Sequence, residues 1–263
     1  MRVQRRHRRR GKAWMLLAAA ACCALGAAAL VLLLPTVTAQ RLIQDGGNPT
    51  LTAVSSRQAL NAPYLSQEDY PTGCESVAAV MALQYWGVDL TVEEFIDGYL
   101  PLGDAPHTDS AGHFVGCDPR KAFPGDPRKE TGWGCYSPVI EKALVQVLGD
   151  QQRHDLAVAR VDGASLEELY DKYVSQGTPV LLWVTIGMET PRVSALFTLE
   201  DSGETFAWLY PLHCVLWVGM EGEDFLFHDP LAGPATRYAA QEVFAAYDGL
   251  GRQAVVVAAT GGD

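Results

Sequence analysis

The chain has 263 residues, with 20 Lys and Arg against 31 Asp and Glu, and a formal net charge of −11 at pH 7. Seven of the basic residues lie among the first twelve, so the residues from Thr36 onward hold the other 13 together with all 31 acidic ones. Such an acidic chain repels phosphate groups, and the composition therefore argues against a protein that binds nucleic acid or anionic lipid headgroups.

An uncharged apolar run of 22 residues, from Ala13 to Leu34, follows the basic N-terminus. About 20 apolar residues cross a bilayer as one helix, so we expect a transmembrane signal-anchor at 13–34. The basic cluster at 1–12 then stays in the cytoplasm, and the rest of the chain lies outside it. A signal peptide cleaved after Ala39 is the alternative, and it predicts a secreted protein.

The exported part divides into a short linker and one domain. Residues 35–58 mix Thr, Gly, Asn and Ser with weak periodicity, which predicts a stalk. Residues 59–263 are long enough for one domain with a full hydrophobic core.

Helical patterns come first in this domain. The expected helices span 74–86, 91–100, 137–148 and 165–176, and a stretch rich in Pro, Gly and Asp at 103–133 reads as a surface excursion between them. Strands are then expected at 179–186, 205–209, 213–219, 225–229 and 253–259, with one more helix at 240–247. Helices followed by a largely antiparallel sheet predict an α+β fold.

Cys74 lies at the start of the first expected helix. Thr72 and Glu75 fit a capping box, which makes Cys74 the second helical residue. Its sulfur would then lie at the positive end of the helix dipole, where the pKa of a thiol falls and a nucleophilic thiolate is favoured. The alternative is a small buried side chain, the usual role of a free cysteine.

A β-hairpin is expected to bring a histidine and a carboxylate together. If residues 220–222 form its loop with Gly222 left-handed, His213 pairs directly with Asp229 on the same face. The carboxylate would then fix the imidazole tautomer and stabilise its cation. The alternative is a strand-end histidine beside an Asp-Pro turn. His228 is a rival for the role of base, but its side chain should point to the opposite face.

Three further features complete the sequence reading. Gln67 could donate its side-chain amide to an oxyanion together with the Cys74 N–H, although a solvated loop glutamine is the alternative. Cys117 and Cys135 could form a disulfide outside the cell. No C-x-x-C occurs, and a cluster of candidate ligands matches no closed metal site, so we expect neither a metal nor another cofactor. Those ligands are His107, His113, Cys117 and Asp118.

Several sequence blocks together resemble the double-glycine-leader peptidase-like proteins, a bacterial branch of the papain-like cysteine peptidases. The blocks lie at 64–67, 71–75, 85–87, 118–119, 132–138, 177–180, 213–216 and 229–230. The resemblance implies a papain-like fold in which the nucleophile helix packs on an antiparallel sheet. It also implies that Cys74 is the nucleophile, His213 the general base and acid, Asp229 the orienting residue and Gln67 the oxyanion donor.

The best-known relatives trim leader peptides inside the cell, whereas this domain is expected to face outward, so that substrate is not carried over. The sequence predicts an extracytoplasmic cysteine peptidase that acts on a peptide or protein through an acyl-enzyme. One alternative is transfer of the acyl group to an amine. The other is a non-catalytic papain-like module that binds cell-wall peptide or a partner protein.

Overall fold

The computed structural model describes residues 54–261. The expected membrane anchor at 13–34 and the cleavage site after Ala39 lie outside these residues. None of the helices within the described range is long and apolar enough to span a membrane.

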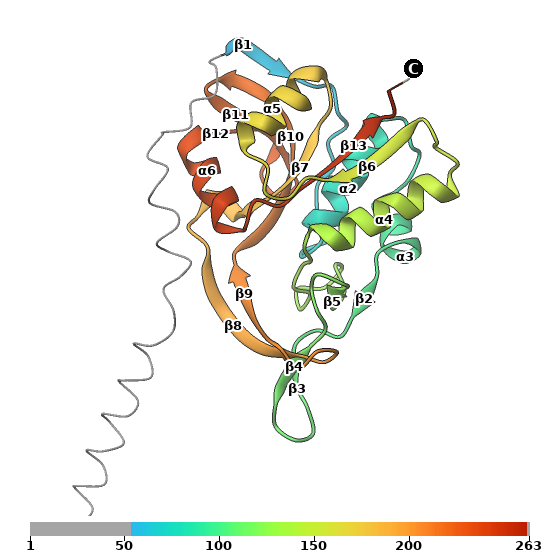
Figure 1. Ribbon diagram of the computed structural model, residues 1–263, viewed down its shortest axis with the longest axis vertical. Helices are drawn as coiled ribbons and strands as arrows, with labels where there is room; N and C mark the ends of the chain where they lie inside the picture. The colour runs from blue at the N-terminus through green and yellow to red at the C-terminus, as the bar shows by residue number, and fades with distance from the viewer. Residues whose placement is uncertain (1–53, 262–263) are drawn as a thin grey trace, which may run out of the picture. The chain divides into compact units, whose positions relative to one another are not determined.

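An antiparallel sheet of seven strands forms the centre of the domain (Figure 1). Its strands lie in the order β12-β11-β10-β7-β13-β6, and β1 pairs with β10 beside this path. The strands are β1 (Val54–Ala59), β6 (Leu156–Arg160), β7 (Val180–Thr185), β10 (Leu212–Gly222), β11 (Asp224–Asp229), β12 (Gly233–Tyr238) and β13 (Ala254–Ala259). Every residue of β7 is buried, which explains why its sequence is a continuous apolar run without alternation.

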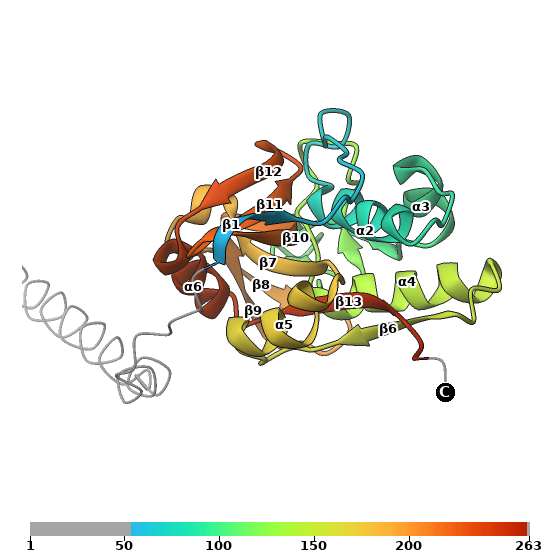
Figure 2. The same cartoon turned by 90° about the horizontal axis from the view of Figure 1, so that it is seen from above.

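Helices cover both faces of this sheet, as Figure 2 shows. One face carries α2 (Cys74–Tyr85) and α4 (Ser137–Asp150), with α3 (Val92–Gly98) packed beside α2. The other face carries α5 (Leu166–Lys172), the single turns η1 (Val174–Gln176) and η2 (Ile186–Met188), and α6 (Ala240–Gly249). Two hydrophobic clusters result, one on each side of the sheet.

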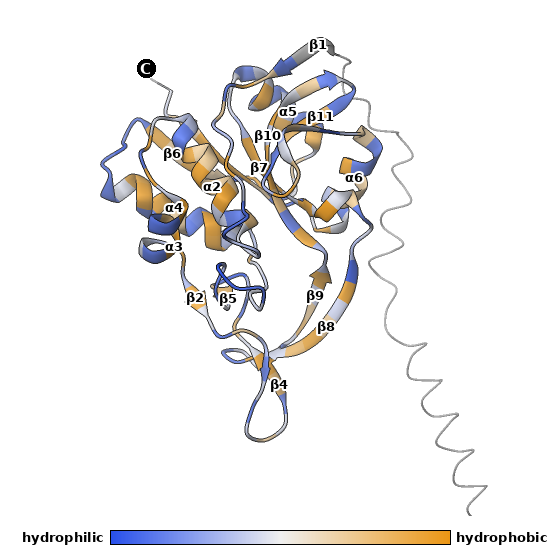
Figure 3. Ribbon diagram, turned by 180° about the vertical axis from the view of Figure 1, so that it is seen from behind, coloured by the Kyte–Doolittle hydropathy of each residue, from blue (hydrophilic) through white to orange (hydrophobic). Residues whose placement is uncertain are grey.

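The helix α2 is buried over most of its length, and residues 74–83 are all buried. Its sequence is apolar all round, as expected for a helix enclosed by other elements. The helix α4 is amphipathic instead, and hydrophobic residues mark its buried side in Figure 3. This burial fixes the start of α2, where Cys74 lies, deep in the domain.

A second sheet links the residues between α3 and α4 to the C-terminal half. It has the order β3-β4-β8-β9 and contains a long ribbon of two strands, β8 and β9 (Figure 1). Its strands are β3 (His107–Thr108), β4 (Phe114–Gly116), β8 (Arg192–Leu199) and β9 (Thr205–Tyr210), and a separate pair joins β2 (Leu102–Gly103) to β5 (Phe123–Pro124). The excursion at 103–133 is therefore anchored, and its Asp118 and Phe123 are buried.

The sequence analysis found most elements but missed several strands. The expected helices and the strands at 179–186, 205–209 and 253–259 are confirmed within a few residues at most ends. The capping box of Thr91 and Glu94 is present. The missed strands include β6, β8 and β12, and the short strands β2, β3, β4 and β5 at the excursion. The strand β1 belongs to the main sheet, although it lies within the stretch expected to be a stalk.

Candidate active site

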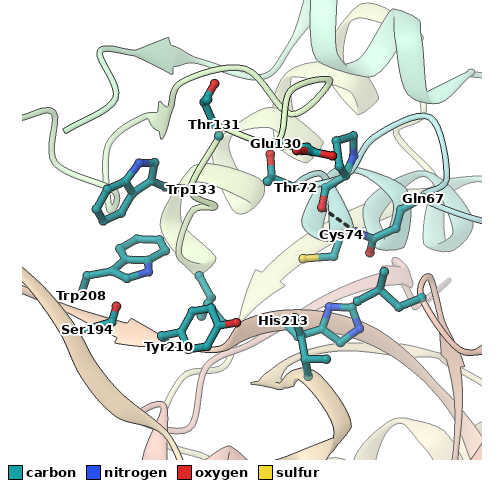
Figure 4. Close-up of a pocket in the computed structure, with 15 residues that line it drawn as sticks. Gln67, Thr72, Cys74, Glu130, Thr131, Trp133, Ser194, Trp208, Tyr210 and His213 are labelled. Atoms are coloured by element: carbon teal, nitrogen blue, oxygen red, sulfur yellow. Dashed lines mark hydrogen bonds between the residues drawn. The ribbon is translucent and has the colours of Figure 1, made fainter. Parts of the chain in front are cut away.

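A cavity of about 400 Å³ lies between the helical part of the domain and the strands of the C-terminal half (Figure 4). Residues 67–74 and 130–133 supply one wall, and β8, β9, β10 and Leu231 supply the other. Three of the four predicted site residues line this cavity, namely Gln67, Cys74 and His213. In Figure 4 the ring of His213 lies below Cys74, and both side chains border the same cavity.

Cys74 is the first residue of α2, and the expected capping box is wrong. The N-cap is Gly73, and no side chain caps the helix. The Thr72 hydroxyl donates to the Lys129 carbonyl instead, at 3.1 Å. Glu75 accepts a hydrogen bond from the backbone N–H of Cys135 at 2.8 Å, so its carboxyl group is turned away from the N-cap. Both side chains follow tertiary contacts that the local sequence does not reveal.

The surroundings of Cys74 also correct the expected acidity of its thiol. Burial raises the pKa of the Cys74 thiol well above its usual range, and the nearby carboxyl group of Glu75 raises it further. A backbone hydrogen bond from Cys214 acts in the opposite direction but does not outweigh these effects. A thiol whose pKa is raised needs a base to become a reactive thiolate.

A hydrogen bond of 2.8 Å joins His213 Nε2 to Asp229 Oδ1, and both side chains are buried. The direct pairing expected for these residues is wrong. Trp217 pairs with Phe227, and counting along the strands from that pair puts Asp229 opposite Val215. His213 and Asp229 are diagonal neighbours on one face, where longer side chains still meet. Because Nε2 is engaged, Nδ1 is the imidazole atom left to face the cavity.

The hairpin register differs because of a turn and a bulge that the sequence analysis did not place. Glu221 pairs with Asp224, which leaves a turn of two residues in place of the expected loop at 220–222. Gly222 is left-handed as predicted, with φ of +65°. The register then shifts between Trp217 and Gly219. The two-residue turn and this bulge together move the pairing near His213 by two residues from the expected one, so His213 and Asp229 stay on the same face.

Asp229 has more hydrogen-bond partners than the sequence indicated. Tyr238 donates its hydroxyl to Oδ2 at 2.6 Å, and the Leu231 N–H donates to Oδ1 at 2.9 Å. Burial alone would raise the pKa of Asp229, but the hydrogen bond and charge of His213, with Tyr238 and Leu231, lower it to about 2. Tyr238 was missed because it lies on β12, a strand that the sequence analysis did not find.

His228 points to the other face of β11, as predicted. Its Nε2 lies 2.8 Å from the Ala62 carbonyl oxygen, and its Nδ1 accepts from the Ala235 N–H at 3.0 Å. These bonds fit a neutral ring with its proton on Nε2. Burial lowers the pKa of His228, although the bond to Ala62 opposes this. His228 therefore ties the segment before Gln67 to the hairpin and does not enter the cavity.

Gln67 is buried at the edge of the cavity. Its Nε2 donates to the Pro71 carbonyl at 3.2 Å and to the Tyr70 carbonyl at 3.5 Å. Its Oε1 is buried and has no hydrogen-bond partner among the described residues. The Cys74 N–H has no backbone acceptor among them. A bound carbonyl oxygen would accept from the Cys74 N–H and could replace the more distant Tyr70 carbonyl as an acceptor of Gln67 Nε2, and a donor on the same ligand would satisfy Oε1.

Aromatic side chains line the part of the cavity away from Gln67 (Figure 4). Trp133 and Trp208 pack edge to face with their ring centroids 5.3 Å apart. Tyr210 and Leu231 at the rim are 44% and 51% exposed, so large apolar surface faces the opening. Such a wall suits an apolar ligand group. The sequence analysis did not predict this wall, because Trp133 and the β9 residues Trp208 and Tyr210 are far apart in the chain and no local pattern indicates that they meet.

The other candidate sites are not formed. Cys117 and Cys135 are free thiols, so the expected disulfide is absent from the structure. His113 pairs with Asp109, and Asp118 pairs with Arg120. Between residues 54 and 261, no group of three or more His, Cys, Asp or Glu side chains could hold a metal ion.

The sequence model of the Peptidase_C39 like family matches residues 59–255. The chain belongs to this family. Membership in the Peptidase_C39 like family indicates a cysteine peptidase, and the mixed α/β fold agrees with it. No curated protein matches the chain.

Two solved structures resemble the domain. A C39-like peptidase from Bacillus anthracis is 21% identical with a TM-score of 0.66, and the match covers 79% of this chain and 100% of that one. It shows a shared fold. A double glycine motif protease from an AMS/PCAT transporter, solved with its leader peptide, is 11% identical with a TM-score of 0.36 over 80% of this chain and 100% of that one. A likeness this low says nothing about the substrate of this chain.

The pKa of Asp229 predicts a specific loss of stability in acid. A carboxyl group with a depressed folded-state pKa stabilises the fold above its unfolded pKa, near 4, and this contribution disappears as the pH falls toward 2. Asp229→Asn should therefore lower the free energy of unfolding by about 2 kcal/mol at pH 7, and the difference from the parent should shrink between about pH 4 and pH 2. Urea unfolding at each pH measures it.

Glu223→Gln, an exposed change in the same hairpin, is the matched control and should show no such trend. A difference between Asp229→Asn and the parent that stays constant from pH 7 to pH 2 would show that the carboxylate is not stabilised by its neighbours.

Proposed function

We propose that the domain is an extracytoplasmic cysteine peptidase that hydrolyses peptide bonds through Cys74, His213 and Asp229. The observation that carries the proposal is the shared cavity of Cys74 and His213, with the hydrogen bond from His213 Nε2 to Asp229 behind them. A thiol, an imidazole and a carboxylate in this order are the groups that nucleophilic acyl transfer requires. Family membership supports the reaction class.

Acylation begins when His213 Nδ1 removes the proton of the Cys74 thiol. The sulfur then attacks the substrate carbonyl carbon, and the electron pair of the C=O bond moves to oxygen. The Cys74 N–H supplies a hydrogen bond to that oxygen, and Gln67 Nε2 supplies a second one when its long bond to the Tyr70 carbonyl gives way. The tetrahedral intermediate collapses to a thioester as His213 gives its proton to the leaving amine.

Asp229 acts behind the imidazole throughout. As a carboxylate it accepts from Nε2–H, holds Nδ1 toward the sulfur and stabilises the imidazolium that forms in each step. Hydrolysis follows when His213 removes a proton from water, which attacks the thioester carbonyl and releases the Cys74 thiolate. The thiolate recovers its proton from His213, and the cycle closes.

The aromatic wall supports a peptide substrate with a large apolar side chain near the scissile bond. The cavity volume lies within the range of sites that bury small ligands. Trp133, Trp208 and Tyr210 line it beside Cys74 and His213. A glycine would leave this apolar surface in contact with water, whereas a phenylalanine or leucine would cover it.

The outward location is part of the proposal because it rests on the N-terminal sequence. A basic cluster before 22 uncharged apolar residues supports a single anchor with the domain outside. The acidic balance of the remaining chain fits an exported domain.

The assignment of the base is tested with two histidines of one hairpin. Cys74→Ala should abolish cleavage of an internally quenched peptide library, and His213→Ala should lower kcat/KM by about 100-fold or more. His228→Gln is the matched control, because it removes a buried imidazole outside the cavity, and its loss should be small once corrected for folded protein. An equal loss in His213→Ala and His228→Gln would contradict the assignment.

The same assay separates the alternatives. Amine-dependent formation of a new amide without hydrolysis would identify a transferase. A folded protein whose Cys74 reacts with no electrophilic peptide, and which cleaves no peptide, would identify a non-catalytic binding module.

Substrate preference should follow the aromatic wall. Peptides with Phe or Leu next to the scissile bond should have a kcat/KM about 10-fold or more above the Gly peptide. Tyr210→Ala should reduce this ratio several-fold. Leu196→Ala, on the opposite face of the same ribbon, is the control and should leave it unchanged. A ratio near one in the parent protein would contradict the apolar preference.

Topology is tested in intact cells. Protease added outside should digest the domain and spare an N-terminal tag. A domain that becomes accessible only after lysis would refute the outward orientation. Release of the domain with Gln40 as its first residue would favour the cleaved signal peptide over the anchor.

A further inference from the structure

Glu75 is a buried carboxyl group that touches the sulfur of the proposed nucleophile. Its side chain is 0% exposed, and its Oε2 lies 3.4 Å from Cys74 Sγ. Its Oε1 accepts the Cys135 N–H at 2.8 Å. Gly134 leaves room for this oxygen, because a Cβ at that position would come within 2.8 Å of Oε1.

The groups around Glu75 come from three elements and include no permanent cation. Its own helix α2 supplies Cys74, the segment before α4 supplies Cys135 and Tyr136, and β10 supplies His213 and Cys214. No Lys or Arg between residues 54 and 261 forms an ion pair with Glu75. A buried carboxylate without a cation is unfavourable, and burial accordingly raises the pKa of Glu75.

The contact has opposite effects in the two protonation states of the carboxyl group. A carboxylate 3.4 Å from the sulfur accepts the thiol proton and repels a thiolate, since two like charges at that distance oppose one another. A carboxylic acid can instead keep Oε1 as the acceptor for Cys135 and donate its O–H from Oε2 to the sulfur. The heavy-atom positions are the same in both states.

We infer that Glu75 is a further catalytic residue, which as a carboxylic acid donates a hydrogen bond from Oε2 to the Cys74 thiolate. The role rests on the proposed peptidase function. The proton of the Cys74 thiol moves to His213 Nδ1, the S–C bond forms, and the O–H bond of Glu75 stays intact. The same hydrogen bond stabilises the thiolate when it leaves the acyl-enzyme. Loss of the Glu75 proton places two negative charges side by side and removes the reactive form.

The test follows alkylation of Cys74 by iodoacetamide from pH 5 to pH 8, located by mass spectrometry. Glu75→Gln keeps an acceptor for Cys135 and a donor for the sulfur but cannot ionise. The ratio of its rate to the parent rate should be near one while Glu75 is protonated, and it should rise to about 10-fold or more as Glu75 ionises. A ratio that stays constant over the pH range in which the carboxylic acid band of Glu75 disappears from the infrared spectrum would overturn the inference, because a purely structural role predicts that result.

Glu68→Gln is the matched control, since Glu68 is exposed in the loop before α2 and does not line the cavity. Its ratio to the parent should stay near one at every pH. A rise equal to that of Glu75→Gln would overturn the inference, because it would reflect loss of charge anywhere near the cavity.

A second measurement covers the case in which Glu75→Gln does not fold. Burial raises the pKa of Glu75. Infrared spectra of the parent protein should therefore keep a carboxylic acid C=O band above about pH 5, where exposed Asp and Glu side chains ionise, and the absence of such a band would overturn the inference. Failure of the proposed function has a different signature, namely no peptide cleavage by a protein whose Cys74 still shows the pH-dependent ratio.

Discussion

The burial of the first turn of α2 is the constraint on which the candidate site depends. Cys74 is 6% exposed, and Glu75 and Ser76 are not exposed at all. A helix start usually relies on a side-chain cap or water for its free N–H groups, and this one has no side-chain cap. Its position is set instead by packing against β10 and the segment before α4. The low polarity that results disfavours the charged form of every ionisable group near the sulfur.

Long-range contacts hold the remaining groups against this helix start. The Gln67 N–H donates to the Pro230 carbonyl at 3.1 Å, which joins the loop before α2 to the end of β11. His228 binds the Ala62 carbonyl from the same strand. Two consecutive residues of β11 therefore make different contacts. Asp229 binds His213 on one face, and His228 holds the segment before Gln67 on the other. Removal of either contact would loosen one side of the cavity while the other stays in place.

Features that depend on local sequence pattern were predicted correctly. The strand register, which depends on contacts between distant segments, was not. The apolar surface of α2 and the alternation along β10 and β11 placed Cys74 at a helix start and set His213 and Asp229 on one face. The exact register needed the bulge at Gly219, where a Cβ would overlap the carbonyl oxygen of Gln58 on β1. That close approach depends on a strand in a segment that reads as a stalk, so no local pattern could indicate it.

The two carboxyl groups nearest the cysteine and histidine have opposite environments. Asp229 accepts from His213, Tyr238 and a backbone N–H, and these partners keep it ionised although it is buried. Glu75 has a single backbone N–H from another segment and the sulfur of Cys74, with no cation to offset its burial. Different surroundings give two neighbouring acids different pKa values. One site can therefore hold a carboxylate and a carboxylic acid at the same pH. An anion behind the imidazole favours its protonation, and a neutral donor beside the sulfur favours its ionisation. In the proposed mechanism, together they lower the cost of moving one proton from Cys74 to His213, which the burial of both residues would otherwise oppose.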